Sequence, residues 1–494
     1  MMIINDRRFY YSFFCVLYIG SSLLTAFFGL TKFRALDYHG LDFTYYLEFS
    51  VKVFDRSLSH RFSGSPGGIN FLNFFGIDGG ASLHQGVHFE PVKYIFGSLY
   101  YFFPYVGVLF FFAGAFYFLP LLYLVFAYRT AEPTDKLFAM LVGVSYALFP
   151  SALGAATYDL RPYSFFAPLL FMIFLAINLR RSLLGTTILF NTLFLIREEA
   201  LFFGGVIILY IIFSLRGKEL RERIRPFVVS WLMWAAVTAT YFWWAGFARQ
   251  SDGSFTSRFG GVGLVVCVIG LSILASAFRK KFNLEKIVYF PLLIGLLPIV
   301  WVFIAERQTW SLRYIVGPLL YDARWSLLWV FILALIFILW QTVSPIRRWR
   351  FLCVYGTASI VIIVFNFLPL INSVLSIVRA DRLKAIDAAV VFQMRDRTRP
   401  GSSFILTDDT THKAFPDFEH VFAYEALPAY MITSSQRYYP ENRALLSRLL
   451  KEKIEYIVIS NANVGVVLPL AKAAGGNWVL TNHSGSYSIF ERGK

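Results

Sequence analysis

The chain has 494 residues, of which 57% are hydrophobic and 15% are charged, and its formal net charge is +16. Soluble domains carry about 25% charged residues, so this composition excludes an ordinary soluble enzyme and predicts a polytopic α-helical membrane protein. The basic residues are spread over many short loops rather than gathered on one face, so we expect no nucleic-acid partner.

Apolar runs long enough to cross a membrane recur through residues 1–379, which we interpret as one transmembrane domain. The first run, 9–30, follows Arg7 and Arg8 and lacks a small-residue cleavage site, so we expect an uncleaved helix with a cytoplasmic N-terminus. A short aromatic helix is expected at 92–103. The other expected segments, which bring the total to about eleven, are 104–128, 136–153, 163–179, 182–197, 200–215, 226–247, 260–278, 287–305, 324–342 and 351–371.

The positions of the basic clusters predict how the chain crosses the membrane. With the N-terminus inside, the loops expected in the cytoplasm carry Arg180–Arg181, the basic stretch 216–225, Arg279–Lys281 and Arg347–Arg350. Dense clusters of Lys and Arg are typical of cytoplasmic loops, so all four agree with this orientation. We therefore expect a multi-pass protein of the cytoplasmic (inner) membrane whose C-terminal domain is extracytoplasmic.

A polar loop, 31–92, separates the first two long apolar segments. It opens with a stretch that contains Asp42 and Glu48 and closes with His88-Phe89-Glu90-Pro91. Apolar residues at helical spacing predict an amphipathic helix at 41–55 on the membrane surface. The predicted orientation places this loop on the extracytoplasmic side.

After about residue 380 the long apolar runs stop and charges become regular. Helices are expected at 381–397, 443–453 and 466–474, and strands at 403–406, 455–460 and 487–491. This pattern predicts a small α/β domain, 380–494, on the outer face. Asp408, Asp409 and His412 follow the first strand and are interpreted as a turn.

The same orientation gathers further charged groups at the outer ends of the helices. Asp159 and Arg161 lie between the expected segments 136–153 and 163–179, and Arg197-Glu198-Glu199 lies between two short segments with wholly apolar flanks. Charged groups in such apolar surroundings are functional candidates. The competing interpretation of Arg197–Glu199 is a tight, solvated turn with an internal ion pair.

Each candidate has a chemical role that suits its side chain. A carboxylate near an apolar surface has a raised pKa, so Asp42 would act as a general base on a hydroxyl, although it also precedes a helix as an N-cap. Guanidinium groups bind phosphate in a bidentate way, which suits Arg161 and Arg197. His88 and Glu90 would bind a sugar, or a divalent metal together with Asp42 or Asp159.

Four motifs together resemble an uncharacterised prokaryotic membrane family, domain of unknown function 2079. Asp42–Glu48 resembles an Asp-Leu-Gly-x-Phe-x-Gln pattern, from which Thr44 and Glu48 depart, and His88–Pro91 resembles His-Phe-Ser-Pro. Tyr158–Pro162 resembles Asp-Phe-His-Pro with Arg161 in place of histidine, and Arg197–Ala200 resembles Lys-Glu-Asp-Ala. The closing stretch Tyr487–Arg492 is similar to the C-terminal strand of that family.

This family is similar to the GT-C superfamily of integral membrane glycosyltransferases, and the resemblance implies transfer of a sugar from a polyprenyl-phosphate donor. Asp42, Glu198 and Glu199 would then be the catalytic candidates. The candidates for substrate binding are Glu48, His88, Glu90, Asp159, Arg161 and Arg197, and those for a metal are His88 and Asp159. Two other classes stay open, namely a transporter or lipid flippase and a non-catalytic envelope assembly protein.

Overall fold

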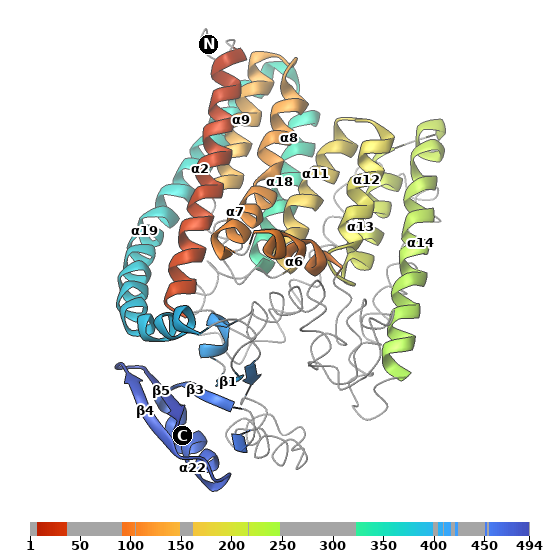
Figure 1. Cartoon of the computed structure of the whole chain (residues 1–494). Coiled ribbons are helices and arrows are strands. Elements are labelled where there is room, and N and C mark those ends of the chain that lie inside the picture. Colours follow the sequence, from red (N-terminus) through yellow and green to blue (C-terminus); the bar gives the residue numbers. More distant parts are fainter. Residues whose placement is uncertain are drawn as a thin grey trace, which may run out of the picture. The chain divides into compact units, whose positions relative to one another are not determined.

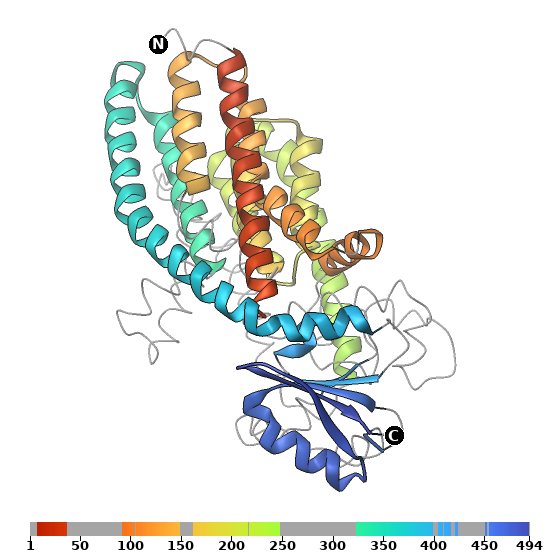
Figure 2. The same cartoon turned by 60° about the vertical axis from the view of Figure 1, so that its left-hand side comes forward.

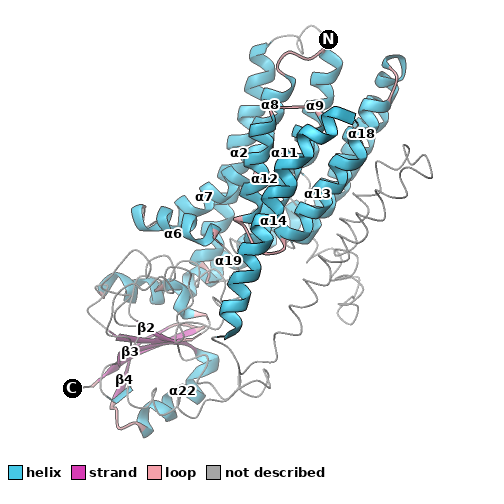
Figure 3. Cartoon of the chain, turned by 90° about the vertical axis from the view of Figure 1, so that its right-hand side faces the viewer, coloured by secondary structure: helices cyan, strands magenta, loops and turns pink. Residues whose placement is uncertain are grey.

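The computed structural model describes residues 7–36, 91–103, 105–148, 162–215, 217–247, 323–398, 404–408, 410–415, 420–422, 450–451 and 454–493. In this part the chain is mostly helical, with one small sheet near the C-terminus (Figures 1 and 3). The predicted segments 41–55, 260–278 and 287–305 lie outside the described residues.

The described residues form two compact units. Unit 1 contains those within 1–26, 75–93 and 110–370, and unit 2 contains those within 27–74, 94–109 and 371–494. Unit 1 is built from helices, whereas unit 2 contains the sheet.

The helices occupy the segments for which the sequence predicts them. Their bounds are α2 Arg7–Arg34, α6 Val92–Phe102, α7 Val106–Tyr117, α8 Leu119–Tyr128, α9 Pro133–Leu148, α11 Phe166–Asn178, α12 Leu183–Phe194, α13 Ala200–Ser214, α14 Gly217–Phe247, α18 Ala323–Thr342 and α19 Pro345–Arg397, and the short 3-10 helix η1 spans Pro162–Phe165. Within the described residues, two stretches are long and apolar enough to cross a membrane, namely α2 and Val106–Tyr128.

Two boundaries differ from the predicted ones. The expected segment 104–128 is divided at Phe118, because Pro120 has no N–H to continue the helical hydrogen bonds. The expected segment 351–371 and the helix 381–397 form one continuous helix, α19. The intervening residues 372–380 contain neither Gly nor Pro, so nothing in their sequence ends the helix.

Close contacts between small residues hold α2 against α7. A Cβ atom at Gly114 would lie 2.8 Å from Cβ of Thr25 and 3.1 Å from the backbone oxygen of Ser22. Small residues that let two helix backbones approach closely are typical of helix contacts in membranes. Any side chain larger than the hydrogen of Gly114 would therefore force α2 or α7 to move.

A buried polar cluster joins α9, α18 and α19 in the interior of unit 1. The hydroxyl of Tyr355 donates to Oγ of Ser145 at 3.0 Å, and Oγ of Ser145 donates to Oγ of Ser359 at 3.1 Å. The indole N–H of Trp329 donates to the carbonyl of Ser145 at 3.0 Å. These groups are neutral and satisfy one another, so the cluster fixes helix positions without burying a charge.

Unit 2 contains a five-stranded sheet with the order β2-β1-β3-β5-β4. The strands are β1 Phe404–Thr407, β2 His420–Phe422, β3 Ile454–Ser460, β4 Trp478–His483 and β5 Tyr487–Arg492, and the helix α22 spans Asn461–Ala473. Strand β1 runs parallel to β2 and β3, and β5 runs antiparallel to β3 and β4. The predicted strands at β1, β3 and β5 are confirmed.

Both faces of this sheet are covered, because alternate residues of each strand point to opposite sides. Leu406, Ile457 and Phe490 enter the cluster that includes Val467 and Ala471 of α22. The neighbouring residues of the strands, Ile405, Val458 and Ile489, pack with buried residues of α19 such as Ala388 and Val391. Figure 2 shows the sheet between α22 and the last turns of α19. The unit is thus a three-layer α/β/α arrangement.

Candidate functional site

The turn between α12 and α13 holds three charged side chains in an ion-paired group. Nε of Arg197 lies 3.1 Å from a carboxylate oxygen of Glu199 and 3.8 Å from one of Glu198. The side chains of Arg197 and Glu198 are 19% and 18% exposed, and that of Glu199 is 38% exposed. Two carboxylates and one guanidinium leave this partly buried turn with one excess negative charge.

The backbone explains why this turn is short and acidic. The carbonyls of Arg197, Glu198 and Glu199 accept the first N–H groups of α13, from Ala200, Leu201 and Phe202, at 3.0–3.1 Å. A helix N-terminus carries a partial positive charge, which favours carboxylates at these positions. The ion pair expected in a tight turn is therefore present, and its acidic members are placed where the helix dipole stabilises them.

Two tryptophans of α14 fix the helix ends on either side of the turn. The indole N–H of Trp231 donates to the carbonyl of Leu201 at 2.7 Å. The indole N–H of Trp234 donates to Oδ1 of Asn191 at 2.9 Å, and its ring stacks on Phe194 with centroids 5.9 Å apart. Their spacing of three residues puts both rings on one face of α14. These two positioning residues are not among the candidates predicted from the sequence, although their spacing of three residues in a helix marks them as a pair.

The first polar loop ends beside this turn. The backbone N–H of Val92, the first residue of α6, donates to the carbonyl of Leu195 at 2.7 Å. Leu195 directly follows α12 and lies two positions before Arg197. The described residues that directly follow the motif His88–Pro91 are thus hydrogen-bonded to the chain that directly precedes Arg197.

The start of α11 reaches the same turn. The rings of Phe166 in α11 and Phe203 in α13 have centroids 5.1 Å apart. The N–H of Phe203 donates to the carbonyl of Glu199 at 3.3 Å. Phe166, which lies four residues after the motif Tyr158–Pro162, therefore packs against the first turn of α13.

The structure therefore brings together the flanks of three of the four predicted motifs. Only Arg197, Glu198 and Glu199 among the predicted site residues are described. The other candidates, Asp42, Glu48, His88, Glu90, Asp159 and Arg161, lie outside the described residues. Within the described part, no group of three or more His, Cys, Asp or Glu side chains is arranged to hold a metal ion.

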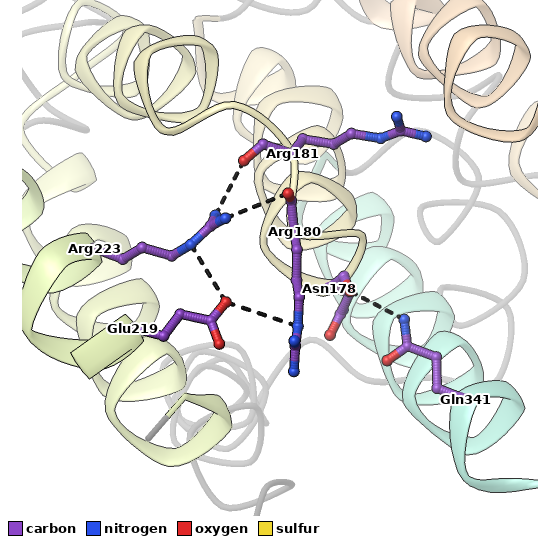
Figure 4. Close-up of polar contacts among 6 residues, drawn as sticks. All are labelled: Asn178, Arg180, Arg181, Glu219, Arg223 and Gln341. Atoms are coloured by element: carbon purple, nitrogen blue, oxygen red, sulfur yellow. Dashed lines mark hydrogen bonds and ion pairs between the residues drawn. The ribbon is translucent and has the colours of Figure 1, made fainter. Parts of the chain in front are cut away.

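The opposite end of unit 1 is basic and is joined by its own polar contacts (Figure 4). Arg223 of α14 donates to the carbonyls of Arg181 and Arg180, at 3.0 and 3.3 Å, and so binds the turn between α11 and α12. Glu219 lies 3.7 Å from Nε of Arg180 and 3.5 Å from Nε of Arg223. Gln341 of α18 donates to the carbonyl of Asn178 at 3.3 Å.

Further basic residues gather at this end. The starts of α2, α9, α12, α14 and α19 lie at the same end as the last turns of α8, α11, α13 and α18 (Figure 1). Arg181 donates to the carbonyl of Ala127, which lies near the end of α8, and Arg348 lies 3.4 Å from Asp135 of α9. Three of the predicted cytoplasmic clusters, Arg180–Arg181, the described part of 216–225 and Arg347–Arg350, therefore share one end, and Arg197–Glu199 lies at the other.

The polar cluster that follows β1 is structural. Asp408 is fully buried, and its carboxylate accepts hydrogen bonds from the N–H groups of Thr410, Thr411 and Ser460, from the hydroxyl of Thr411 and from the amide of Asn463. These bonds connect the end of β1 to the end of β3 and to the first turn of α22. The expected turn is thus confirmed at Asp408, whereas Asp409 lies outside the described residues.

No protein-family model matches the chain, and a search of curated proteins likewise finds no match. The resemblance to domain of unknown function 2079 and to the GT-C enzymes therefore stays a prediction that depends on the four sequence motifs.

Proposed function

We propose that the protein is a membrane glycosyltransferase that moves a sugar from a polyprenyl-phosphate donor to an acceptor hydroxyl on the outer side of the cytoplasmic membrane. The observation that carries this proposal is the convergence at the α12–α13 turn. A hydrogen bond from Val92 and a ring contact from Phe166 bring the ends of two polar loops to the ion-paired group Arg197–Glu199.

Chain connectivity supports placing the remaining candidates near this turn. Glu90 precedes Val92 by two residues and Arg161 precedes Phe166 by five, and an extended chain spans at most about 3.6 Å per residue. We therefore propose that His88, Glu90, Asp159 and Arg161 face the same site as Glu199. No described residue ties Asp42 to the turn, so its assignment depends on the motif alone.

The proposed reaction is a direct displacement at the anomeric carbon of the sugar. Asp42 takes the proton of the acceptor hydroxyl, while the carboxylates of Glu198 and Glu199 orient the sugar. The acceptor oxygen then bonds to the anomeric carbon while the bond from that carbon to the phosphate oxygen breaks, and polyprenyl phosphate leaves. Arg161 and Arg197 would stabilise the charge on the leaving phosphate.

Two features of unit 1 support a membrane location and the proposed orientation. Large apolar side chains are exposed around its helices, for example Val16 at 72%, Leu184 at 71%, Phe126 at 64% and Val229 at 58%. Exposed apolar surface of this extent is unfavourable in water and favourable in lipid. The basic end would face the cytoplasm, so the Arg197–Glu199 turn would face outward, and we propose about eleven spans in total.

The distribution of charge favours an enzyme over a transporter. In the described part of unit 1, charged residues lie in turns or within the first nine residues of a helix. The buried polar cluster around Ser145, farther along the helices, is neutral. Transport sites are typically built near the membrane midplane from charged groups and interrupted helices. The described residues show instead a charged group at a helix turn.

Transfer assays with the full chain in lipid nanodiscs test this proposal. We expect the protein to consume a polyprenyl-phosphate sugar from a panel of donors and to release polyprenyl phosphate. Asp42→Asn removes the proposed base, so the rate should fall by about 100-fold or more. Full activity of Asp42→Asn would exclude Asp42 as the base, and the absence of turnover with every donor would contradict the assignment as a glycosyltransferase.

A further inference from the structure

One face of α19 in unit 2 presents basic and apolar side chains to the surroundings. Arg379, Arg382, Leu383 and Ile386 have the spacing i, i+3, i+4, i+7, which places them on a single helix face. Leu383 is 70% exposed and Ile386 is 74% exposed, and both arginines are exposed as well. These are large apolar groups to leave in water.

The opposite face of this part of α19 is the one that packs into the core of unit 2. Asp381, Ala388 and Val391 are at most 1% exposed. Ala388 and Val391 belong to the cluster that covers one side of the sheet. One face of this part of α19 is therefore buried against the rest of unit 2. The opposite face is exposed and carries both cationic and apolar side chains.

We propose that this face, defined by Arg379, Arg382, Leu383 and Ile386, lies on the outer surface of the lipid bilayer. Leu383 and Ile386 enter the boundary between headgroups and acyl chains, and Arg379 and Arg382 bind anionic phospholipid headgroups. This inference depends on the membrane location given under the proposed function, but not on the proposed reaction.

The composition of the face and the continuity of the chain select lipid as the occupant. Helices that lie in the membrane interface combine an apolar stripe with Lys and Arg, because the apolar groups enter the acyl region and the cations meet phosphate groups. The helix is unbroken from Ile371 to Leu383, a distance of about 18 Å at 1.5 Å per residue. We propose that the apolar run 351–371 spans the bilayer. Leu383 lies only a few helical turns beyond the end of this run.

Site-directed spin labelling in vesicles of phosphatidylethanolamine and phosphatidylglycerol tests this placement. Single cysteines are introduced as Leu383→Cys and Ile386→Cys after replacement of Cys15, Cys267 and Cys353 by alanine. Two exposed apolar positions provide controls, namely Leu23→Cys on α2, which is 55% exposed and should face lipid, and Val479→Cys on β4, which is 50% exposed and should face water. Collision of each label with oxygen and with a water-soluble nickel chelate reports its depth.

We expect labels at 383 and 386 to collide preferentially with oxygen, as the label at 23 does, and the label at 479 to collide preferentially with the nickel chelate. Replacement of Arg379 and Arg382 by glutamine should shift the labels at 383 and 386 toward the behaviour of the label at 479. If the labels at 383 and 386 match that at 479 while the label at 23 lies in lipid, the surface contact is excluded and the membrane location stands. If the label at 23 is also in water, both the surface contact of α19 and the membrane location of unit 1 are wrong.

Discussion

Arg197 illustrates how one residue serves both the fold and the proposed chemistry. Its Nε lies within 4 Å of two carboxylates that directly precede α13, and its side chain is mostly buried. At the basic end, Arg180 makes a comparable contact with Glu219, but its side chain is 70% exposed. Burial strengthens an ion pair and raises the cost of leaving one partner unpaired, so these two arginines should differ in their effect on stability.

We predict that Arg197→Met destabilises the protein by about 1–3 kcal/mol, because two carboxylates in a partly buried turn lose their shared cation. Arg180→Met removes an exposed ion pair and should change the stability by less than about 1 kcal/mol. Thermal unfolding of both full-length variants in the same detergent measures the difference. Equal stability of the two variants would show that the turn is solvated, as the competing interpretation of the sequence holds.

Asp408 provides a second prediction at the same scale. In the unmodified protein, each carboxylate oxygen of Asp408 accepts a hydrogen bond from a backbone N–H group. An asparagine keeps the shape of the side chain, but it replaces one of these oxygens by an NH₂ group, which cannot accept from an N–H donor. We expect Asp408→Asn to destabilise unit 2 by about 2–3 kcal/mol, measured as faster amide hydrogen exchange in β1 and β3 of the full chain. Asp396→Asn, at an exposed position of α19, should leave exchange unchanged. Unchanged exchange in both variants would contradict the structural role of Asp408.

At the scale of elements, the contact between α2 and α7 depends on Gly114. We predict that Gly114→Ala lowers the stability of unit 1 by about 1–3 kcal/mol, because the new Cβ meets the backbone of α2 and Thr25. Gly20→Ala on α2 is the matched control, since a Cβ there meets nothing within 4 Å and alanine favours the helix. Thermal unfolding of both variants checks this prediction. A neutral Gly114→Ala would mean that the two helices are not closely packed.

Sequence patterns predict well the elements that contain a run of buried apolar side chains. Strands β1, β3 and β5 are predicted because each carries an apolar run buried in the sheet. Strand β4 (Trp478–His483) is missed because it is an edge strand whose residues are mostly exposed, so little apolar alternation marks it. Helix α22 starts at Asn461 rather than near 466, since Asn461 and Asn463 are recruited by bonds to distant residues.

At the candidate site, the charged residues could be predicted from the sequence, but the contacts around them could not. The unusual charges of Arg197–Glu199 are visible in the sequence because their flanks are apolar. The contacts that surround the turn could not be predicted, because the bond from Val92 to Leu195 and the ring contact of Phe166 with Phe203 depend on the packing of helices far apart in the chain. Hydropathy identifies which segments are helical, whereas side-chain packing decides which helix ends meet.

At the scale of the whole molecule, unit 1 has an acidic turn at one end of its helices and a basic network at the other. Glu199 and Glu222 are both ion-paired glutamates, with Arg197 at 3.1 Å and with Lys218 at 3.7 Å, and their side chains are 38% and 63% exposed. They lie at opposite ends of the helical unit, so a reaction on the outer side of the membrane should depend on one of them and not on the other.

A catalytic site at the α12–α13 turn is tested by comparing sugar transfer by Glu199→Gln and Glu222→Gln. Both substitutions remove one carboxylate charge and keep the size of the side chain, and both variants are assayed as full chains in nanodiscs with a polyprenyl-phosphate sugar donor. We predict that Glu199→Gln slows transfer by about 100-fold or more, while Glu222→Gln stays within about twofold of the unmodified protein. Equal rates for the two variants would contradict a catalytic site at the α12–α13 turn.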